Sequence, residues 1–87
     1  MLEIDPIQLG TLEIDHDVWV PYIDLFDAEF VPTRIKVAND EYAFQRSAPT
    51  LGYGAFLPAE IREAKGRGKK PIIVERGERY YLFLTPP

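Results

Sequence analysis

Apolar and polar residues alternate most regularly between residues 33 and 46. The apolar positions are Ile35, Val37, Tyr42 and Phe44. Asn39-Asp40 lies midway between them, and both residue types tolerate the left-handed backbone that a two-residue hairpin turn requires. A turn here pairs Val37 with Tyr42 and Ile35 with Phe44, and side chains two apart point to the same side of a strand. The pattern therefore predicts a β-hairpin with these apolar side chains on one buried face.

The pattern before this hairpin changes phase once. Apolar residues fall at Ile7 and Leu9 and then at Leu12 and Ile14. The change of parity indicates a β-bulge or turn at Gly10-Thr11.

The run Val18–Phe26 is apolar on both parities, which is typical of a strand that is buried on both faces or lies at an interface. Pro21 interrupts the run, so this strand should be bent, bulged or at an edge. A chain of 87 residues has little core with which to cover both faces. We therefore expect the protein to self-associate, most simply as a dimer.

The C-terminal part predicts one short helix at about residues 58–65. Pro58 suits the first turn of a helix, Ile61 and Ala64 lie on one apolar stripe, and Gly66 supplies a stop. The stretch Ser47–Tyr53, with its proline and glycine, predicts a loop that enters this helix.

A second hairpin follows the helix, and two turns are possible for it. A two-residue turn at Arg76-Gly77 would oppose Glu75 and Glu78, which is unfavourable. A three-residue loop would instead pair Glu75 with Arg79 and Val74 with Tyr80.

Together these elements predict a single domain over residues 1–87, of the α+β class and mostly β. It should hold five or six strands, with one short helix before the C-terminal hairpin. A small, partly open β-barrel-like sheet is the simplest arrangement, because it leaves few exposed edges.

Charge is distributed unevenly along the chain. Residues 1–33 hold eight acids and no base, whereas residues 34–87 hold ten bases and six acids, which gives the net charge of −4. This asymmetry indicates either two faces with different partners or acidic and basic segments that lie side by side in the fold. No apolar run is long enough to span a membrane, and cysteine is absent. We expect a soluble cytoplasmic protein.

The residues of catalytic chemistry are sparse. His16 is the only histidine and Ser47 the only serine, so a nucleophile–base pair could be built only from these two. His16 lies between two aspartates, but adjacent residues rarely converge on one metal ion. The carboxylates of Asp24, Asp27 and Glu29 carry no signal that would separate their pKa values, as an acid–base pair requires. We therefore expect no enzyme activity, no cofactor and no metal site.

Two sets of residues are candidates for binding. The first is basic, lies on the helix and on the glycine-rich turn after it, and could hold a phosphate backbone. It consists of Arg62, Arg67, Lys69 and Lys70. The second is aromatic and could stack on bases, fill a partner's pocket or belong to the core. It consists of Trp19, Tyr22 and Phe26.

The C-terminal part also resembles a known family. Gly54–Ala64 contains Leu-Pro and Ile-Arg at the spacing of the AbrB/MazE (SpoVT-type) swapped-hairpin DNA-binding domain, and the resemblance extends over residues 54–87. It implies an intertwined dimer that binds DNA as a transcription regulator or antitoxin, with Arg62 as the motif arginine. Ala55, Lys65 and Lys69-Lys70 depart from the family pattern. The stretch Lys70–Gly77 is similar to the end of Phd/YefM antitoxin domains.

Two functional classes follow from these patterns. In the first, the protein is a small non-enzymatic protein-protein interaction module that uses its acidic half and the Trp19 strand. In the second, it is an AbrB-like DNA-binding regulator or antitoxin that uses its basic C-terminal part. The first accounts for the acidic half and is the preferred hypothesis.

Overall fold

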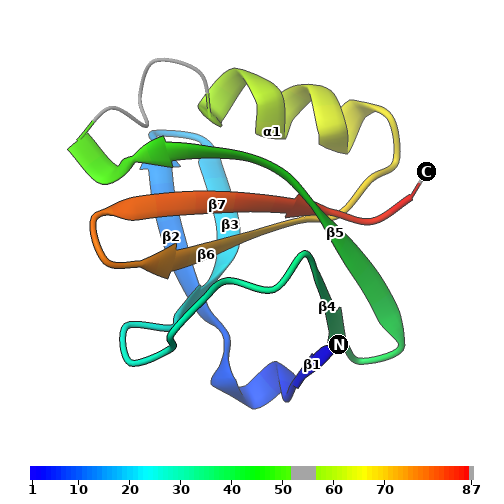
Figure 1. Cartoon of the computed structure of the whole chain (residues 1–87). Coiled ribbons are helices and arrows are strands. Elements are labelled where there is room, and N and C mark those ends of the chain that lie inside the picture. The colour runs from blue at the N-terminus through cyan, green and yellow to red at the C-terminus, as the bar shows by residue number, and fades with distance from the viewer. Residues whose placement is uncertain (52–56, 87) are drawn as a thin grey trace.

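A single curled sheet organises the computed structural model, which describes residues 1–51 and 57–86 (Figure 1). The described part contains seven strands and one α-helix, so the expectation of five or six strands was too low. The elements in chain order are β1 (Leu2–Ile4), a 3-10 helix (Pro6–Gln8), β2 (Gly10–Asp15), β3 (Val18–Asp24), β4 (Arg34–Val37), β5 (Asp40–Pro49), α1 (Leu57–Gly66), β6 (Pro71–Arg76) and β7 (Arg79–Leu84). The predicted class, α+β and mostly β, is confirmed.

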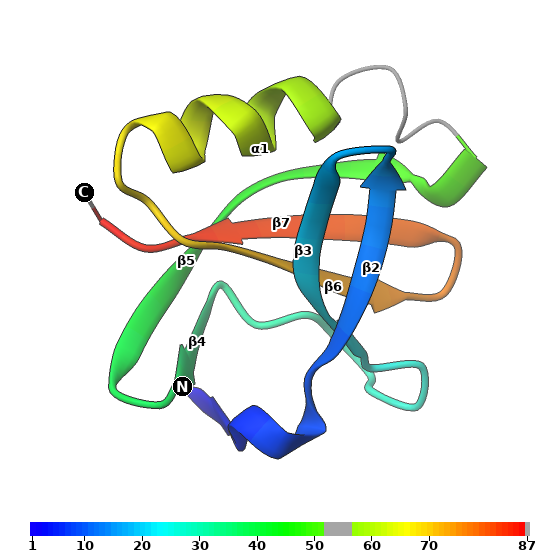
Figure 2. The ribbon, with the colours of Figure 1, turned by 180° about the vertical axis from the view of Figure 1, so that it is seen from behind.

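The strand order is β1-β4-β5-β7-β6-β3-β2. β1 pairs with β4 and β3 with β6 in parallel, while the other neighbours are antiparallel. The sheet curls into a half-barrel, which confirms the predicted partly open barrel. Figure 2 shows the β2–β3 hairpin crossing β6 and β7 at a steep angle, so that its far end reaches α1.

Strand β6 lies at the centre and supplies side chains to two cores. Ile72 and Val74 point to the inside of the curl, where they meet buried residues of β1, β3, β4, β5 and β7. Ile73 points to the other face, where Leu82 of β7 and Ile61 of α1 cover it. A continuous apolar run is what a strand buried on both faces requires.

Helix α1 confirms the predicted helix at about residues 58–65, but it ends differently from the prediction. Gly66 remains helical, and Gly68 takes the left-handed conformation with φ of 78°. The Lys69 N–H donates to the Ala64 carbonyl at 2.9 Å and the Gly68 N–H to the Lys65 carbonyl at 3.1 Å. This is a Schellman ending, in which glycine avoids the cost of a side chain at positive φ.

The β4–β5 hairpin has the predicted face but a different turn. Ala38 and Asn39, with φ of 55° and 92°, form the turn, so Ile35 faces Tyr42 rather than Phe44. Moving the turn by one residue moves the pairing by two, which keeps every side chain on its face. Ile35, Val37 and Tyr42 are buried as predicted, whereas Phe44 is 39% exposed.

Charge favours this register over the predicted one. It places Lys36 opposite Glu41, and Arg34 reaches the same carboxylate at 2.9 Å. The predicted register would have left both cations without an acid opposite them, and opposite charges in cross-strand positions stabilise a pair of strands.

The β6–β7 turn differs from both predicted alternatives. Gly77, with φ of 63°, and Glu78 form it, so Glu75 faces Tyr80 and Arg76 faces Arg79. Glycine occupies the one position where a left-handed residue is needed. The two arginines bond in different directions, because Arg79 donates to the Ser47 hydroxyl and Arg76 to backbone carbonyls.

Two smaller predictions also need correction. The phase change comes from the 3-10 helix Pro6–Gln8, which Asp5 caps, and the only irregularity in β2 pairing lies between Glu13 and Asp15 rather than at Gly10-Thr11. In the predicted loop Ser47–Tyr53, Ser47 to Pro49 continue β5, while the last two residues lie outside the described residues.

Candidate interaction surface

The predicted basic set is largely neutralised by acids of the same chain. Arg62 on α1 donates to Asp15 at 3.0 Å and to Asp17 at 2.6 Å. Arg67 pairs with Glu63 at 2.7 Å on the same helix. The bonds to Asp17 and Asp15 hold the Arg62 side chain against the β2–β3 turn and raise the pKa of Arg62.

The other two members of the basic set differ from each other. Lys70 pairs with Asp40 at 2.8 Å, which raises the pKa of Lys70. Lys69 lines a polar hollow beside α1 together with Gln45 and Glu60. Three of the four bases, Arg62, Arg67 and Lys70, thus pair with an acid of the same chain. In this part of the fold, acidic and basic segments lie side by side.

The Asp15 carboxylate is stabilised in its charged form by two hydrogen bonds. The backbone N–H of His16 donates to it at 2.8 Å, and Arg62 donates from α1, so both bonds lower the pKa of Asp15. Hydrogen bonds to the charged form of a carboxylate favour that form.

The predicted aromatic set does not form one surface. Tyr22 is half-buried against the core under α1, and its hydroxyl donates to the Glu75 carboxylate at 3.0 Å. Burial and the neighbouring Glu75 raise the pKa of Tyr22. Trp19 lies on the opposite face of β3 and is 51% exposed, and Phe26 follows the strand and is exposed.

The double-sided apolar pattern of β3 is partly satisfied within the chain. Val18 and Val20 pack into the core beneath α1, and Ile23 packs into the core inside the curl. Pro21 is exposed and faces Thr11 of the edge strand β2.

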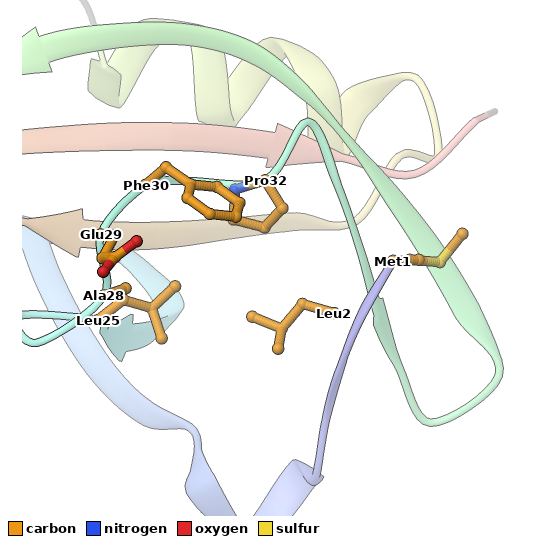
Figure 3. A pocket seen from close by; sticks show the side chains of 7 residues that line it. All are labelled: Met1, Leu2, Leu25, Ala28, Glu29, Phe30 and Pro32. Atoms are coloured by element: carbon orange, nitrogen blue, oxygen red, sulfur yellow. The ribbon is translucent and has the colours of Figure 1, made fainter.

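A hollow lies between β1 and the segment of residues 25–33 that connects β3 to β4. Its volume is about 530 Å³. It is lined by Met1, Leu2, Leu25, Ala28, Glu29, Phe30 and Pro32. Figure 3 shows the Leu2 side chain between Met1 on one side and Leu25 and Ala28 on the other, with open space between Leu2 and Leu25. We call it the apolar pocket.

Arg76 holds the connecting segment in place. Its guanidinium donates to the backbone carbonyls of Ala28 and Glu29. The Leu25 N–H donates to the Glu75 carbonyl at 2.8 Å, and the Ala28 N–H donates to the Leu25 carbonyl at 2.9 Å. This segment therefore presents its side chains from a backbone that the central strand β6 supports.

Large apolar side chains around the pocket remain open to solvent. Phe30 is 73% exposed, and Met1 and Leu2 are also exposed. Phe30 was not among the contact residues predicted from the sequence, because that prediction considered only the apolar run Val18–Phe26. The available signal was the second cluster Phe30-Val31-Pro32, four residues further on.

Glu29 lines this pocket, and Glu3 of β1 stands beside Lys36 of β4 in the sheet register. Residues 1–9 and 24–32 contain five carboxylates and no lysine or arginine. None of the five forms an ion pair with the described residues. They are Glu3, Asp5, Asp24, Asp27 and Glu29. The pocket thus has a mostly apolar lining that includes the Glu29 carboxylate, and the segments that form it carry further acids. We call these acids together the acidic rim.

Other kinds of site have little support in the described part. It contains no group of three or more histidine or acidic side chains that could hold a metal ion, and none of its helices is long and apolar enough to cross a membrane. Gly54 to Phe56, which begin the AbrB/MazE-like stretch, lie outside the described residues. No protein-family model, curated protein or solved structure matches the chain.

Proposed function

We propose that the protein is a small non-enzymatic protein-protein interaction module whose contact surface is the apolar pocket with its acidic rim. The observation that carries this proposal is the gathering of exposed Met1, Leu2 and Phe30 around one hollow. Single exposed apolar residues are ordinary on a protein surface, whereas a rimmed cluster of them marks a binding site.

Of the three aromatic residues predicted to contact a partner, only Phe26 belongs to this surface. Phe26 and Phe30 are both exposed and belong to the same supported segment, so we assign Phe26 to this surface as well. Tyr22 is occupied by its bond to Glu75, and Trp19 lies elsewhere on the β2–β3 hairpin.

Affinity capture from the native cell tests this function. The bait is the wild-type chain, and the pocket variant is Phe30→Ser. Ile7→Ser is the matched control, because it also removes an exposed apolar side chain, but from the 3-10 helix. A partner of the pocket should be retained by the wild type and by Ile7→Ser and lost by Phe30→Ser.

The retained protein must then bind the purified module in a titration, with affinity lowered at least tenfold by Phe30→Ser, which corresponds to about 1.4 kcal/mol. Equal retention by all three baits would refute the assignment of the surface. Circular dichroism of each bait confirms that it is folded.

The AbrB-like DNA-binding regulator or antitoxin remains the second candidate, because α1 and its glycine-rich turn carry the four predicted bases. The ion pairs of Arg62, Arg67 and Lys70 weigh against it, since each pair must open before a phosphate can bind. A titration with mixed duplex and single-stranded DNA at about 50 mM salt decides between them, because electrostatic binding is strongest at low salt.

Self-association is a separate proposal. Half-exposed Trp19 is the residue of β3 that a second copy would cover. Sedimentation at about micromolar to tens of micromolar protein tests it, since weak dimers dissociate below that range. A species of 10.0 kDa alone would mean that the chain acts as a monomer.

A further inference from the structure

β1 is an edge strand of the sheet, and its first residue, Leu2, lines the apolar pocket. In the described part, β1 pairs only with β4, and it is the last strand of the sheet on that side. Its sequence, Leu2-Glu3-Ile4, has no lysine, proline or bulge, and what limits pairing at this edge is its three-residue length and the Glu3 charge. The opposite edge, β2, carries an irregularity between Glu13 and Asp15.

The side chains of β1 continue the core inside the curl. Leu2 stands beside Ile35 and Ile4 beside Val37. Ile4 is buried, but Leu2 faces the pocket and stays partly exposed. A further strand would lie about 4.8 Å beyond β1. Its alternate side chains would enter the same layer, in the space between Leu2 and Leu25 that Figure 3 shows.

The charge of the rim specifies the occupant. None of the five carboxylates of residues 1–9 and 24–32 forms an ion pair with the described residues, although Glu3 stands beside Lys36 in the register. A partner therefore gains most if it supplies lysine or arginine. A second copy of this chain fits poorly, because its own edge would bring Glu3 and Asp5 against the same acids. Like charges in such positions destabilise a strand pair.

We propose that the β1 edge accepts an extended segment of a partner protein as an added strand, with large apolar side chains in the pocket and lysine or arginine residues against the acidic rim. This inference rests on the proposed function and specifies the partner's binding mode. Because β1 has three residues, the backbone ladder is short, and the pocket supplies much of the affinity.

A synthetic peptide is the direct probe. Lysine occupies every second position of this peptide, and the positions between are valine, phenylalanine and valine. A second version carries glutamate in place of each lysine. A third version has the lysine sequence with N-methylated backbone amides, which cannot form a strand ladder. Binding is followed through the amide resonances of the ¹⁵N-labelled full chain.

The lysine peptide should shift the resonances of β1 and of residues 25–33. The glutamate and N-methylated peptides should bind at least tenfold more weakly, and raising the salt should weaken the lysine peptide, because exposed charges are screened. Phe30→Ser should lose binding, Ile7→Ser should not, and Glu29→Lys should favour the glutamate peptide.

Several results would overturn strand addition. One is equal binding of the N-methylated and lysine peptides, and another is no binding of the lysine peptide. Resonance shifts confined to the turn of Asp15 and Asp17 would also overturn it. So would sedimentation that shows a dimer for the wild type and a monomer for Phe30→Ser, because a second copy would then cover the pocket. If a captured partner depends on Phe30 but strand addition fails, the proposed function stands. If no partner depends on Phe30 and no peptide binds, both fail.

Discussion

Ile61→Ala should be one of the most damaging substitutions on α1. Ile61 is 0% exposed and joins the helix to the core formed by Val18, Val20, Ile73 and Leu82. The change deletes three carbon atoms, each worth roughly 0.8 kcal/mol when buried. The cavity left behind adds to this cost, while the higher helix propensity of alanine returns a few tenths of a kcal/mol.

The expected loss is therefore about 2.5–4 kcal/mol in the free energy of unfolding. A chain of 87 residues has a total stability of roughly 4–13 kcal/mol, so the variant is severely weakened. The melting temperature should fall by about 10–30 °C, as a small domain loses about 4–8 °C per kcal/mol. Urea unfolding followed by far-ultraviolet circular dichroism measures the change.

Ile7→Ala is the matched control, because it deletes the same three carbon atoms from a side chain that is 90% exposed. Its effect should stay within about 0.5 kcal/mol. A cost below about 1 kcal/mol for Ile61→Ala, or equal costs for the two variants, would refute the assignment of Ile61 as the residue that fixes the helix to the sheet.

Three further predictions concern the β4–β5 turn, the part-buried hydrogen bond of Tyr22, and the effect of pH. Ala38→Gly should raise stability by about 0.5–1 kcal/mol, because alanine is strained at positive φ, whereas Ala43→Gly in extended β5 should lower it; equal effects in chemical unfolding would contradict this. Tyr22→Phe should cost about 1–2 kcal/mol by leaving the Glu75 carboxylate without its donor, measured in the same assay, and no cost would contradict the bond. Because the pKa of Asp15 is lowered in the fold from 3.8, its stabilisation is present at neutral pH and lost in acid. Asp15→Asn should therefore be less stable than wild type at pH 7, with the difference shrinking as the pH falls below 3.8; a constant difference would contradict it.

The parts of the fold that the sequence predicted are those with local causes. The helix at about residues 58–65 follows from an apolar stripe and a proline within one short stretch. The buried face of the β4–β5 hairpin follows from alternation alone. It was predicted correctly although the turn was not, because the observed pairing differs from the predicted one by two residues, which keeps each side chain on its face. The turn itself depends on whether Lys36 meets Glu41, which alternation does not decide.

The parts that were missed depend on residues far apart in the chain. Arg62 and Asp15 are 47 residues apart, and nothing near either of them in the sequence announces their pairing. The parallel pairing of β1 with β4 likewise has no local signal, so β1 was not foreseen as a separate strand. Phe30 lies in a connection without periodicity, and the bonds that hold this connection come from Arg76, 46 residues further along the chain than Phe30.

The charges of the chain divide between two tasks. Bases of the C-terminal part stabilise the fold through exposed pairs such as Arg62 with Asp17 and Lys70 with Asp40, and exposed pairs are individually weak and salt-sensitive. The carboxylates of residues 1–9 and 24–32, which include Glu29 in the apolar pocket, form no ion pair within the described part. A cluster of unpaired acids costs stability through mutual repulsion, which a basic partner would remove. Salt should therefore weaken binding at the pocket more steeply than it weakens the fold, whose two cores are apolar.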